Sequence, residues 1–359
     1  MADKYLIALT HFPKFGPASL HKLAALNSWA AGYAAPASLL TTLGLDQKVI
    51  AEFIAWRAGA DPEAFLATMA KNQIKAVTLD DELYPPLLKN IYQPPPLLFY
   101  QGELNPELYH LPLAVVGSRR PSAYGQLVVS RLVKDLAAHN LTIVSGLAFG
   151  IDALAHQTAL EVQGKTIAVL GSGLDRANLY PAANRHLADK IIDSGGVIFS
   201  EFPPLTAATK FSFPRRNRLI SGMSLGVLVI EAAAKSGSLI TAHYGLEQSR
   251  EVMAVPGNIF SDQSCGANHL IKLGARPVTS SADVFEILGM EPADSRPALD
   301  QNLTAEEIQI LQLTNQEAKH LDEIKNLLSL DIGVITSTLT LMEIKGLIKN
   351  IGNSTYIRL

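Results

Sequence analysis

The sequence predicts an α/β protein whose centre is a doubly wound, mostly parallel sheet, with a small helical domain before it and a smaller module after it. Two observations lead to this fold class. Between about residues 108 and 288, short apolar runs ending in glycine or serine alternate with helix-like segments, as in a parallel sheet covered by helices on both faces. On either side of that stretch, apolar residues recur at helical spacing. We therefore expect a Rossmann-like central domain between two smaller modules.

Residues 1–75 are predicted to form the small helical domain, of the SAM or helix-hairpin-helix type. Leu20, Leu23 and Leu26 share a helical face after the turn at Gly16, and a second helix is expected near residues 48–58. A hairpin with glycine in its turn can hold a DNA backbone through the turn amides, but such hairpins are also common packing units. We favour the packing role for this one.

The central domain is predicted to span residues 76–288. A proline-rich connector, with prolines at 85, 86 and 94–96, marks the domain boundary because helices cannot cross it. Near-continuous apolar runs then predict the strands of the parallel sheet. These runs are Leu113–Gly117, Thr142–Gly146, Thr166–Gly171, Gly196–Ser200, Val227–Ile230 and Val252–Val255.

Residues 289–300 are predicted to be a linker, and residues 301–359 a winged-helix module. The winged-helix prediction rests on two amphipathic helices followed by two short strand-like runs. The first helical face has Leu321, Ile324, Leu327 and Leu328, the second has Ile335, Leu339 and Met342, and the runs are at 346–348 and 356–358. Seven acidic residues against five basic ones favour a protein-interaction or regulatory role over duplex binding, although Lys345 and Lys349 leave DNA contact open.

Composition excludes several classes of protein. The formal net charge of -3 argues against indiscriminate DNA binding without excluding a local basic groove. The single cysteine, Cys265, excludes an intrachain disulfide and a cysteine-based zinc cluster, and the nine histidines lack a paired metal-binding spacing, so we predict no metal. We find no signal peptide and no run of eighteen apolar residues, and we therefore expect a cytoplasmic protein without membrane contact.

The most informative stretch runs from Lys210 to Gly222. Between residues 202 and 230 there are four basic residues and no acidic one. Interleaved with them, Phe211 and Phe213 offer flat rings on which unpaired bases can stack, while the cations offer charge to phosphates. Single-stranded nucleic acid suits both features. The alternative is that the phenylalanines anchor a core and the arginines form a solvated surface.

Small and hydroxyl residues also follow several of the predicted strands. The turns are Gly117-Ser118-Arg119, Ser145-Gly146, Gly171-Ser172-Gly173 and Ser236-Gly237-Ser238. The carboxyl ends of parallel strands line one rim of a sheet, where helix N-termini attract anions. Any one glycine here can simply satisfy turn geometry. Four such turns together with the basic stretch predict a rim that binds a row of phosphates. The planar guanidinium of Arg119 would donate hydrogen bonds to a pair of phosphate oxygens.

Three catalytic patterns nearly occur, and each fails on context. Gly164-Lys165-Thr166 precedes a strand where a phosphate loop would follow one, and Pro181 interrupts the helix that a dinucleotide fingerprint at 171–173 requires. A strand follows Ser224, whereas a serine-hydrolase elbow needs a helix. Asp152, His156 and Glu231 could act as acid-base groups, but a structural role is favoured for them.

These motifs, taken in order, resemble the DprA/Smf (DNA-processing protein A) family. The matching stretches are the turn at 117–119, Ile143–Asp152, Gly171–Asp175, Lys210–Gly222 and Ser236–Ala242, all within residues 80–288. The resemblance implies a bacterial protein that binds and protects single-stranded DNA during natural transformation and loads the RecA recombinase onto it. It also implies a homodimer through the Rossmann-like domain, with no cofactor and no chemical turnover.

Carried over by motif, the resemblance implies a set of DNA-binding residues on the rim of the sheet. They are Gly117, Ser118, Arg119, Ser145, Gly146, Lys210, Phe213, Arg215, Asn217, Arg218, Gly237 and Ser238. Lys210 would contact phosphate and Phe213 a base. Relatives often carry a basic residue after the Tyr-Pro pair, where this chain has Ala182, and Arg185 is the candidate replacement. The competing interpretation is an enzyme similar to nucleotide phosphoribohydrolases, using Glu231 near Ser236-Gly237-Ser238, although the compact Pro-Gly-Gly run is missing.

Overall fold

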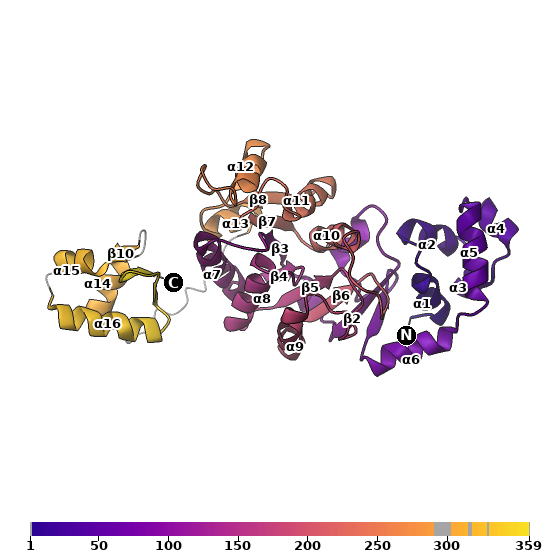
Figure 1. The fold of residues 1–359 in the computed structure, drawn as a ribbon, viewed down its shortest axis with the longest axis horizontal. Helices are drawn as coiled ribbons and strands as arrows, with labels where there is room; N and C mark the ends of the chain where they lie inside the picture. The colour runs from indigo at the N-terminus through magenta and orange to yellow at the C-terminus, as the bar shows by residue number, and fades with distance from the viewer. Residues whose placement is uncertain (1, 291–302, 315–317, 329, 359) are drawn as a thin grey trace. The chain divides into compact units, whose positions relative to one another are not determined.

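The computed structural model describes residues 2–290, 303–314, 318–328 and 330–358. The chain divides into two compact units, Met1–Pro292 and Ala293–Leu359 (Figure 1). Most of the predicted linker at 289–300 lies outside the described residues. The predicted boundary at residue 75 falls inside the first unit and stays a prediction.

The first unit is built on one large sheet. In the described part of the chain, its nine strands follow the order β1-β2-β6-β5-β4-β3-β7-β8-β9. They are β1 (Lys75–Thr78), β2 (Leu97–Gly102), β3 (Pro112–Gly117), β4 (Thr142–Ser145), β5 (Thr166–Leu170), β6 (Val197–Ser200), β7 (Gly226–Ile230), β8 (Glu251–Ala254) and β9 (Arg276–Pro277). Pairing is parallel from β6 to β9, whereas β2 runs antiparallel to both β6 and β1.

The predicted α/β fold class is confirmed, and each of the six predicted strands is present as one of β3 to β8. Apolar runs form these strands because both faces of the sheet are covered; β4, β5, β6 and β7 are buried along their whole length. From β3 the chain adds β4, β5 and β6 on one side and then β7 and β8 on the other. The strand order therefore reverses between β3 and β7, which leaves a crevice at their carboxyl ends.

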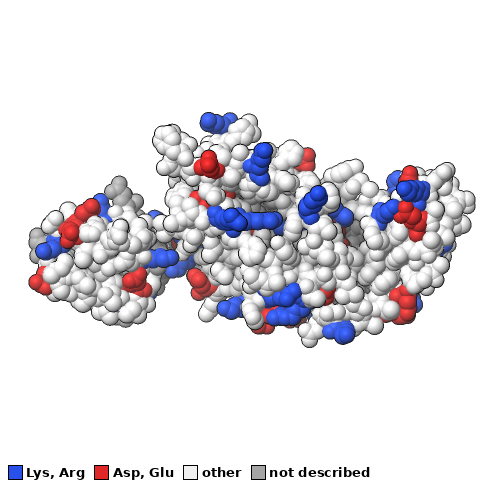
Figure 2. Space-filling model, viewed as in Figure 1, with Lys and Arg blue, Asp and Glu red and all other residues white. Residues whose placement is uncertain are grey.

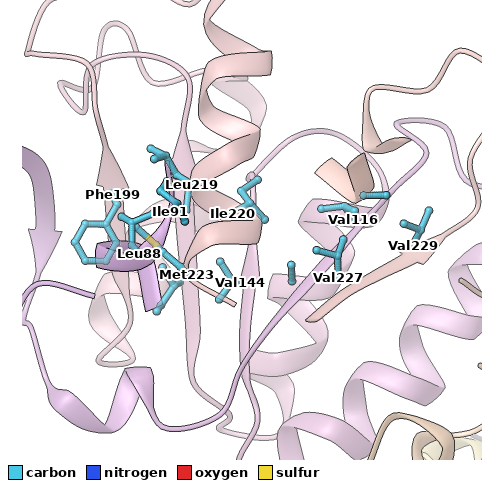
Figure 3. Close-up of a cluster of buried hydrophobic side chains, with 14 of the residues drawn as sticks. Leu88, Ile91, Val116, Val144, Phe199, Leu219, Ile220, Met223, Val227 and Val229 are labelled. Atoms are coloured by element: carbon cyan, nitrogen blue, oxygen red, sulfur yellow. The ribbon is translucent and has the colours of Figure 1, made fainter. Parts of the chain in front are cut away.

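Helices cover both faces of the sheet (Figure 1). On one face the buried side chains of α7, α8 and α13 pack on β3, β4 and β7. On the other face α10, α11 and α12 pack on the same strands. Figure 3 shows Leu219 and Ile220 of α10 in this cluster with Val144 and Val227 of the sheet. The bounds are α7 (Ala123–Ala138), α8 (Ile151–Glu161), α9 (Arg185–Asp193), α10 (Ser212–Gly222), α11 (Ser238–Glu247), α12 (Cys265–Lys272) and α13 (Ser281–Ile287), with short 3-10 helices η2 (Pro106–Tyr109) and η3 (Ala182–Asn184).

The proline-rich segment lies inside the first unit and contributes to its core. Its 3-10 helix η1 (Pro86–Asn90) places Leu88 and Ile91 in the core against the end of α10 (Figure 3). Tyr84, just before it, is fully buried. A Cβ atom at Gly222 would lie 2.7 Å from the Leu88 side chain, so the glycine permits this close approach. The prolines exclude a long helix, but burial of the apolar side chains between them favours packing of this segment in the core.

The N-terminal residues form six short helices in the described part of the chain, as predicted for this region. They are α1 (Lys4–His11), α2 (Pro17–Ala24), α3 (Trp29–Ala34), α4 (Ala37–Thr42), α5 (Gln47–Arg57) and α6 (Pro62–Lys71). Phe12, Phe15 and Phe53 centre their own core. Leu6 and Ile7 belong instead to a cluster that includes Phe99 of β2, so α1 packs on the edge of the large sheet.

The second unit has the predicted winged-helix architecture. Its elements are α14 (Ala305–Leu313), β10 (Lys319–His320), α15 (Leu321–Leu328), α16 (Ile332–Ile344), β11 (Ile348–Asn350) and β12 (Thr355–Arg358), with the strands in the order β10-β12-β11. Among the described residues of the whole chain, no single helix has both the length and the apolar composition to cross a membrane; α15 and α16 meet that test only as a pair bent by 119°.

Candidate functional site

A cavity of about 790 Å³ opens where the strand order reverses. Gly117 ends β3 and Ser118 follows it, and the turn from Lys235 to Gly237 leads into Ser238, the first residue of α11. The segment before α10 and the first turn of that helix also line the cavity, through Thr209, Lys210 and Phe213. We call this cavity the groove. A row of Lys and Arg side chains crosses the middle of the first unit on the face shown in Figure 2.

Three predicted residues share the opening of the groove. The guanidinium carbon of Arg119 lies 5.2 Å from the centre of the Phe213 ring, and Lys210 lines the same cavity with an exposed side chain. Tyr180 adds a second ring, with its centroid 5.8 Å from that of Phe213. Two cations and two aromatic rings therefore surround one solvent-open space, as a phosphate with an unpaired base requires.

The floor of the groove is held by Arg216, which is almost fully buried. Its Nη1 donates hydrogen bonds to the carbonyl oxygens of Gly146 (2.6 Å) and Val169, and thus ties α10 to the ends of β4 and β5. A Cβ atom at residue 146 would lie 2.3 Å from that nitrogen, so the close approach requires glycine. Burial lowers the pKa of Arg216 to about 10, which still leaves the guanidinium charged at neutral pH.

Asp152 faces this guanidinium from the first turn of α8. Its Oδ2 accepts a hydrogen bond from the Gly146 amide at 3.1 Å. Burial raises the pKa of Asp152, and the charge of Arg216 opposes that rise. Of the described residues that line the groove, four are basic (Arg119, Lys210, Arg216 and Lys235) and Asp152 is the one acid. The groove therefore carries a positive charge inside a chain that is acidic overall.

The start of α11 supplies backbone donors to the groove. The Ser236 and Ser238 hydroxyls lie 2.7 Å apart, and the cap residue Gly237 is exposed and makes no side-chain cap. The Asn217 amide donates to the Gly237 carbonyl at 3.2 Å, which fixes this turn against α10. The Ser238 amide donates to the Ser236 hydroxyl at 3.4 Å, and the positive end of the dipole of this ten-residue helix favours a bound anion.

The structure brings most of the predicted DNA-binding residues together in the lining of the groove. These are Gly117, Ser118, Arg119, Lys210, Phe213, Asn217, Gly237 and Ser238. The other four lie elsewhere. Ser145 is buried and donates to the Val115 carbonyl, and Gly146 lies beneath the floor. Arg218 donates to Glu201 at 2.7 Å, and Arg215 lies 3.8 Å from the same carboxylate oxygen. Residues three apart share one face of a helix, and these two arginines lie on a face of α10 that is outside the groove lining.

Sequence reasoning left three basic or aromatic lining residues out of the predicted site, and a DNA contact by Arg185 stays a prediction. Tyr180, Lys235 and Arg216 line the groove. Lys235 directly precedes the predicted turn at Ser236, so a search for basic residues beside the turns could have found it, and Tyr180 is the tyrosine of the Tyr-Pro pair before Ala182. Arg185 instead donates to the Ala177 carbonyl at 2.7 Å and is not part of the lining.

The candidate acid-base residues have structural partners. Glu231 accepts hydrogen bonds from the amide and the hydroxyl of Ser122, outside the groove. His156 is fully buried beside the Thr166 hydroxyl, and burial lowers its pKa to about 3. Ser224 is buried and donates to the Ile220 carbonyl. Among the described residues, no group of three or more histidine, cysteine, aspartate or glutamate side chains could hold a metal ion.

Comparisons with known proteins agree with this arrangement. A family model described as DNA recombination-mediator protein A matches residues 75–289, and one described as the DprA winged helix domain matches residues 282–351. The chain is 42% identical over 223 residues to DNA processing protein DprA of Bacillus subtilis, covering 62% of this chain and 74% of that protein. It is 45% identical over 226 residues to protein Smf of Escherichia coli, covering 63% and 60%.

Two solved structures are also similar. DNA processing protein A from Streptococcus pneumoniae matches with a TM-score of 0.67 and 36% identity, over 79% of this chain and 98% of that one. DNA processing protein A from Helicobacter pylori, whose structure concerns its single-stranded DNA binding mode, matches with a TM-score of 0.53 and 29% identity, over 60% of this chain and 95% of that one.

Proposed function

Because the chain belongs to the DNA recombination-mediator protein A family, also called DprA/Smf, we propose that it binds single-stranded DNA in the groove between β3 and β7. One observation carries the proposal: Arg119, Lys210 and Phe213 meet at one opening, although they are up to 94 positions apart in the sequence. Cations positioned around an aromatic ring suit a nucleotide of a single strand, because the cations can bind its phosphate while its unpaired base stacks on the ring.

The shape of the groove favours a single strand over a duplex. Its rings, Phe213 and Tyr180, are in its wall, so that a base has to enter the cavity to stack on them. A paired and stacked base would first have to be extruded, which costs a few kcal/mol. Arg119 now lies over the Phe213 ring, and a stacking base would take its place while the guanidinium moves to a phosphate.

The contacts support binding without sequence preference. The donors around the groove are cations, backbone amides at the start of α11 and serine hydroxyls, which suit phosphate oxygens rather than the edge of a particular base. The rings accept any base because every base has a flat face. A protein that coats incoming strands of any sequence needs this kind of recognition.

The finer functional roles rest on the family resemblance. The protein would protect single-stranded DNA that enters the cytoplasm during natural transformation and would load a RecA-type recombinase onto it. It would act as a homodimer through the first unit, so that two grooves engage one strand and raise the overall affinity. Its role would be binding, without chemical turnover or a cofactor.

The alternative role as a phosphoribohydrolase has less support. Glu231, its candidate catalytic residue, does not line the groove and already accepts two hydrogen bonds from Ser122. A general base must reach the proton that it removes, and this carboxylate is occupied by a structural contact.

An equilibrium titration tests the proposal. Fluorescence anisotropy with a labelled oligothymidine and with a blunt duplex of equal length, each at several salt concentrations, should show tighter binding of the single strand and a clear loss of affinity with salt. Equal affinity for both DNAs, or no binding at low salt, would reject it. A strand-coating assay with a RecA-type recombinase and sedimentation of the free protein would test the loading role and the dimer.

A further inference from the structure

A second cavity, of about 480 Å³, lies on the other side of the turn that carries Arg119. We call it the side cavity. It is lined by Ser122 and Tyr124 at the start of α7, by Glu231 after β7, and by the loop that follows β8, through Pro256, Gly257, Asn258, Ser261 and Ser264. No residue is shared between the linings of the two cavities.

The side cavity is nevertheless adjacent to the groove. Gly117 pairs with Ile230 in the parallel ladder, so Ser118 and Glu231 leave neighbouring strands at the same level. The Ser118 hydroxyl, which lines the groove, donates at 3.0 Å to Gln263 of the loop that forms the side cavity. Between the two cavities the exposed side chains of Arg119 and Arg120 face solvent. A strand that leaves the groove beside Arg119 therefore passes the entrance of the side cavity.

The loop of the side cavity is held in a fixed conformation. The Asn268 amide bonds both the N–H and the C=O of Gly257, at 3.1 and 3.0 Å. The Tyr124 hydroxyl donates to the Pro256 carbonyl at 2.8 Å, and Asn258 accepts from the Phe260 amide at 2.9 Å. These contacts keep the cavity open before a ligand arrives, which lowers the entropy cost of binding.

The lining indicates what kind of group would enter. Of its described residues none is basic, and Glu231 is acidic, so a phosphate would be disfavoured. Tyr124 is 46% exposed and offers its ring for stacking. The amide of Asn258 and the serine hydroxyls can each donate or accept hydrogen bonds, so they do not require one particular partner. A flat, polar-edged and uncharged group fits this lining. A nucleobase is such a group, and its phosphate would stay outside with Arg119 and Arg120.

We propose that the side cavity is a second base-binding site, which receives a neighbouring base of the strand whose backbone crosses the Arg119-Arg120 turn. The inference rests on the proposed single-strand binding in the groove and extends it. One protomer would hold two bases, one in each cavity, on either side of a backbone contact. The binding would remain tolerant of sequence, because stacking on Tyr124 does not select a base.

Two substitutions in the same loop test the proposal. Ser261→Phe places a large ring in the side cavity, whereas Ile259→Phe puts the same uncharged ring at an exposed position outside the lining. The affinity of each variant and of the parent protein is measured for an oligothymidine of twelve nucleotides and for the mononucleotide thymidine 5′-monophosphate. Thermal melting confirms that each variant is folded. If Ser261→Phe does not fold, Tyr124→Leu removes the ring from the wall instead.

We expect Ser261→Phe to bind the twelve-nucleotide strand about tenfold more weakly than Ile259→Phe does, since one stacked base is lost. Its affinity for the mononucleotide should change much less, because a single base can occupy the groove alone. Equal affinity of the two variants for the long strand would overturn the inference, as would an equal loss for both DNAs. If the parent protein itself fails to bind the long strand, the proposed function fails and not this extension of it.

Discussion

Lys210→Ala is the most informative substitution in the groove. The Lys210 side chain is exposed, lines the groove and lies 5.1 Å from the Phe211 ring. Its loss should leave the fold intact, because no core cluster contains it. In contrast, Arg119 also packs on Phe213, so its removal would change charge and stacking together. The Lys210 substitution therefore isolates one phosphate contact.

The expected effect follows from the number of cations in the groove. Of the four basic residues in the described lining, Arg216 is buried and bonded to backbone carbonyls, which leaves three for phosphates. For single strands, the logarithm of the binding constant falls by about 0.7 per phosphate contact for each tenfold rise in salt. Three contacts predict a slope of about -2.1 per protomer, and two predict about -1.4. Between 50 and 200 mM salt, affinity should drop about 18-fold for the parent and about 7-fold for the variant.

Anisotropy titrations at four or more salt concentrations measure these slopes. Lys190→Ala is the matched control, since Lys190 is an exposed lysine on α9 outside the groove. The control should keep the parent slope. If Lys210→Ala also keeps the parent slope and affinity, the phosphate path does not cross the groove, and the reasoning is wrong.

Three further predictions concern the floor of the groove and the chemistry. Arg216→Met should lower the free energy of unfolding by about 1.5 to 3 kcal/mol in urea denaturation, because it removes the buried charged donor of the Gly146 and Val169 carbonyls; a change below about 0.5 kcal/mol would contradict this. His156 is neutral in the folded protein with a pKa of about 3, while the unfolded chain takes up a proton below about 6.5. The contribution of His156 to the free energy of unfolding is therefore complete above pH 6.5, and it is lost as the pH falls toward 3, by up to about 1.4 kcal/mol per pH unit. His156→Gln should flatten the urea-derived stability between pH 6.5 and 4.5, and an unchanged slope would refute the assignment. Incubation with AMP should release no free adenine, as measured by chromatography; release that Glu231→Gln abolishes would revive the enzymatic alternative.

The sequence carries enough information for the sheet and for the centre of the site. Buried parallel strands need apolar residues on both faces, so β3 to β8 are visible as continuous runs. Strand β1, at the edge of the sheet, and its neighbour β2 were missed because the proline-rich segment, which has no strand-like pattern, separates this antiparallel pair in the sequence. The burial of Tyr84 and Leu88 in that segment could not be predicted either, since local signals show where helices stop but not what the residues pack against.

In the candidate site, too, features that depend on neighbouring residues could be predicted, whereas contacts between distant residues could not. Lys210 and Phe213 were expected together because they are close in the sequence, and the strand-end turn placed Arg119 on the same rim. The sequence did not show which side of α10 faces the cavity. Arg216 and Asn217 face it, whereas Arg215 and Arg218 contact Glu201, a residue that follows β6. Only the fold determines that partner.

Photochemical cross-linking tests the central claim most directly. An oligothymidine that contains 5-iodouracil is bound to the full-length protein and irradiated, and the linked peptides are identified by mass spectrometry. The account predicts that the major cross-links fall on Phe213 or Tyr180, the two rings in the wall of the groove. Cross-links confined to the second unit, or to rings far from the groove such as Tyr92, would contradict it.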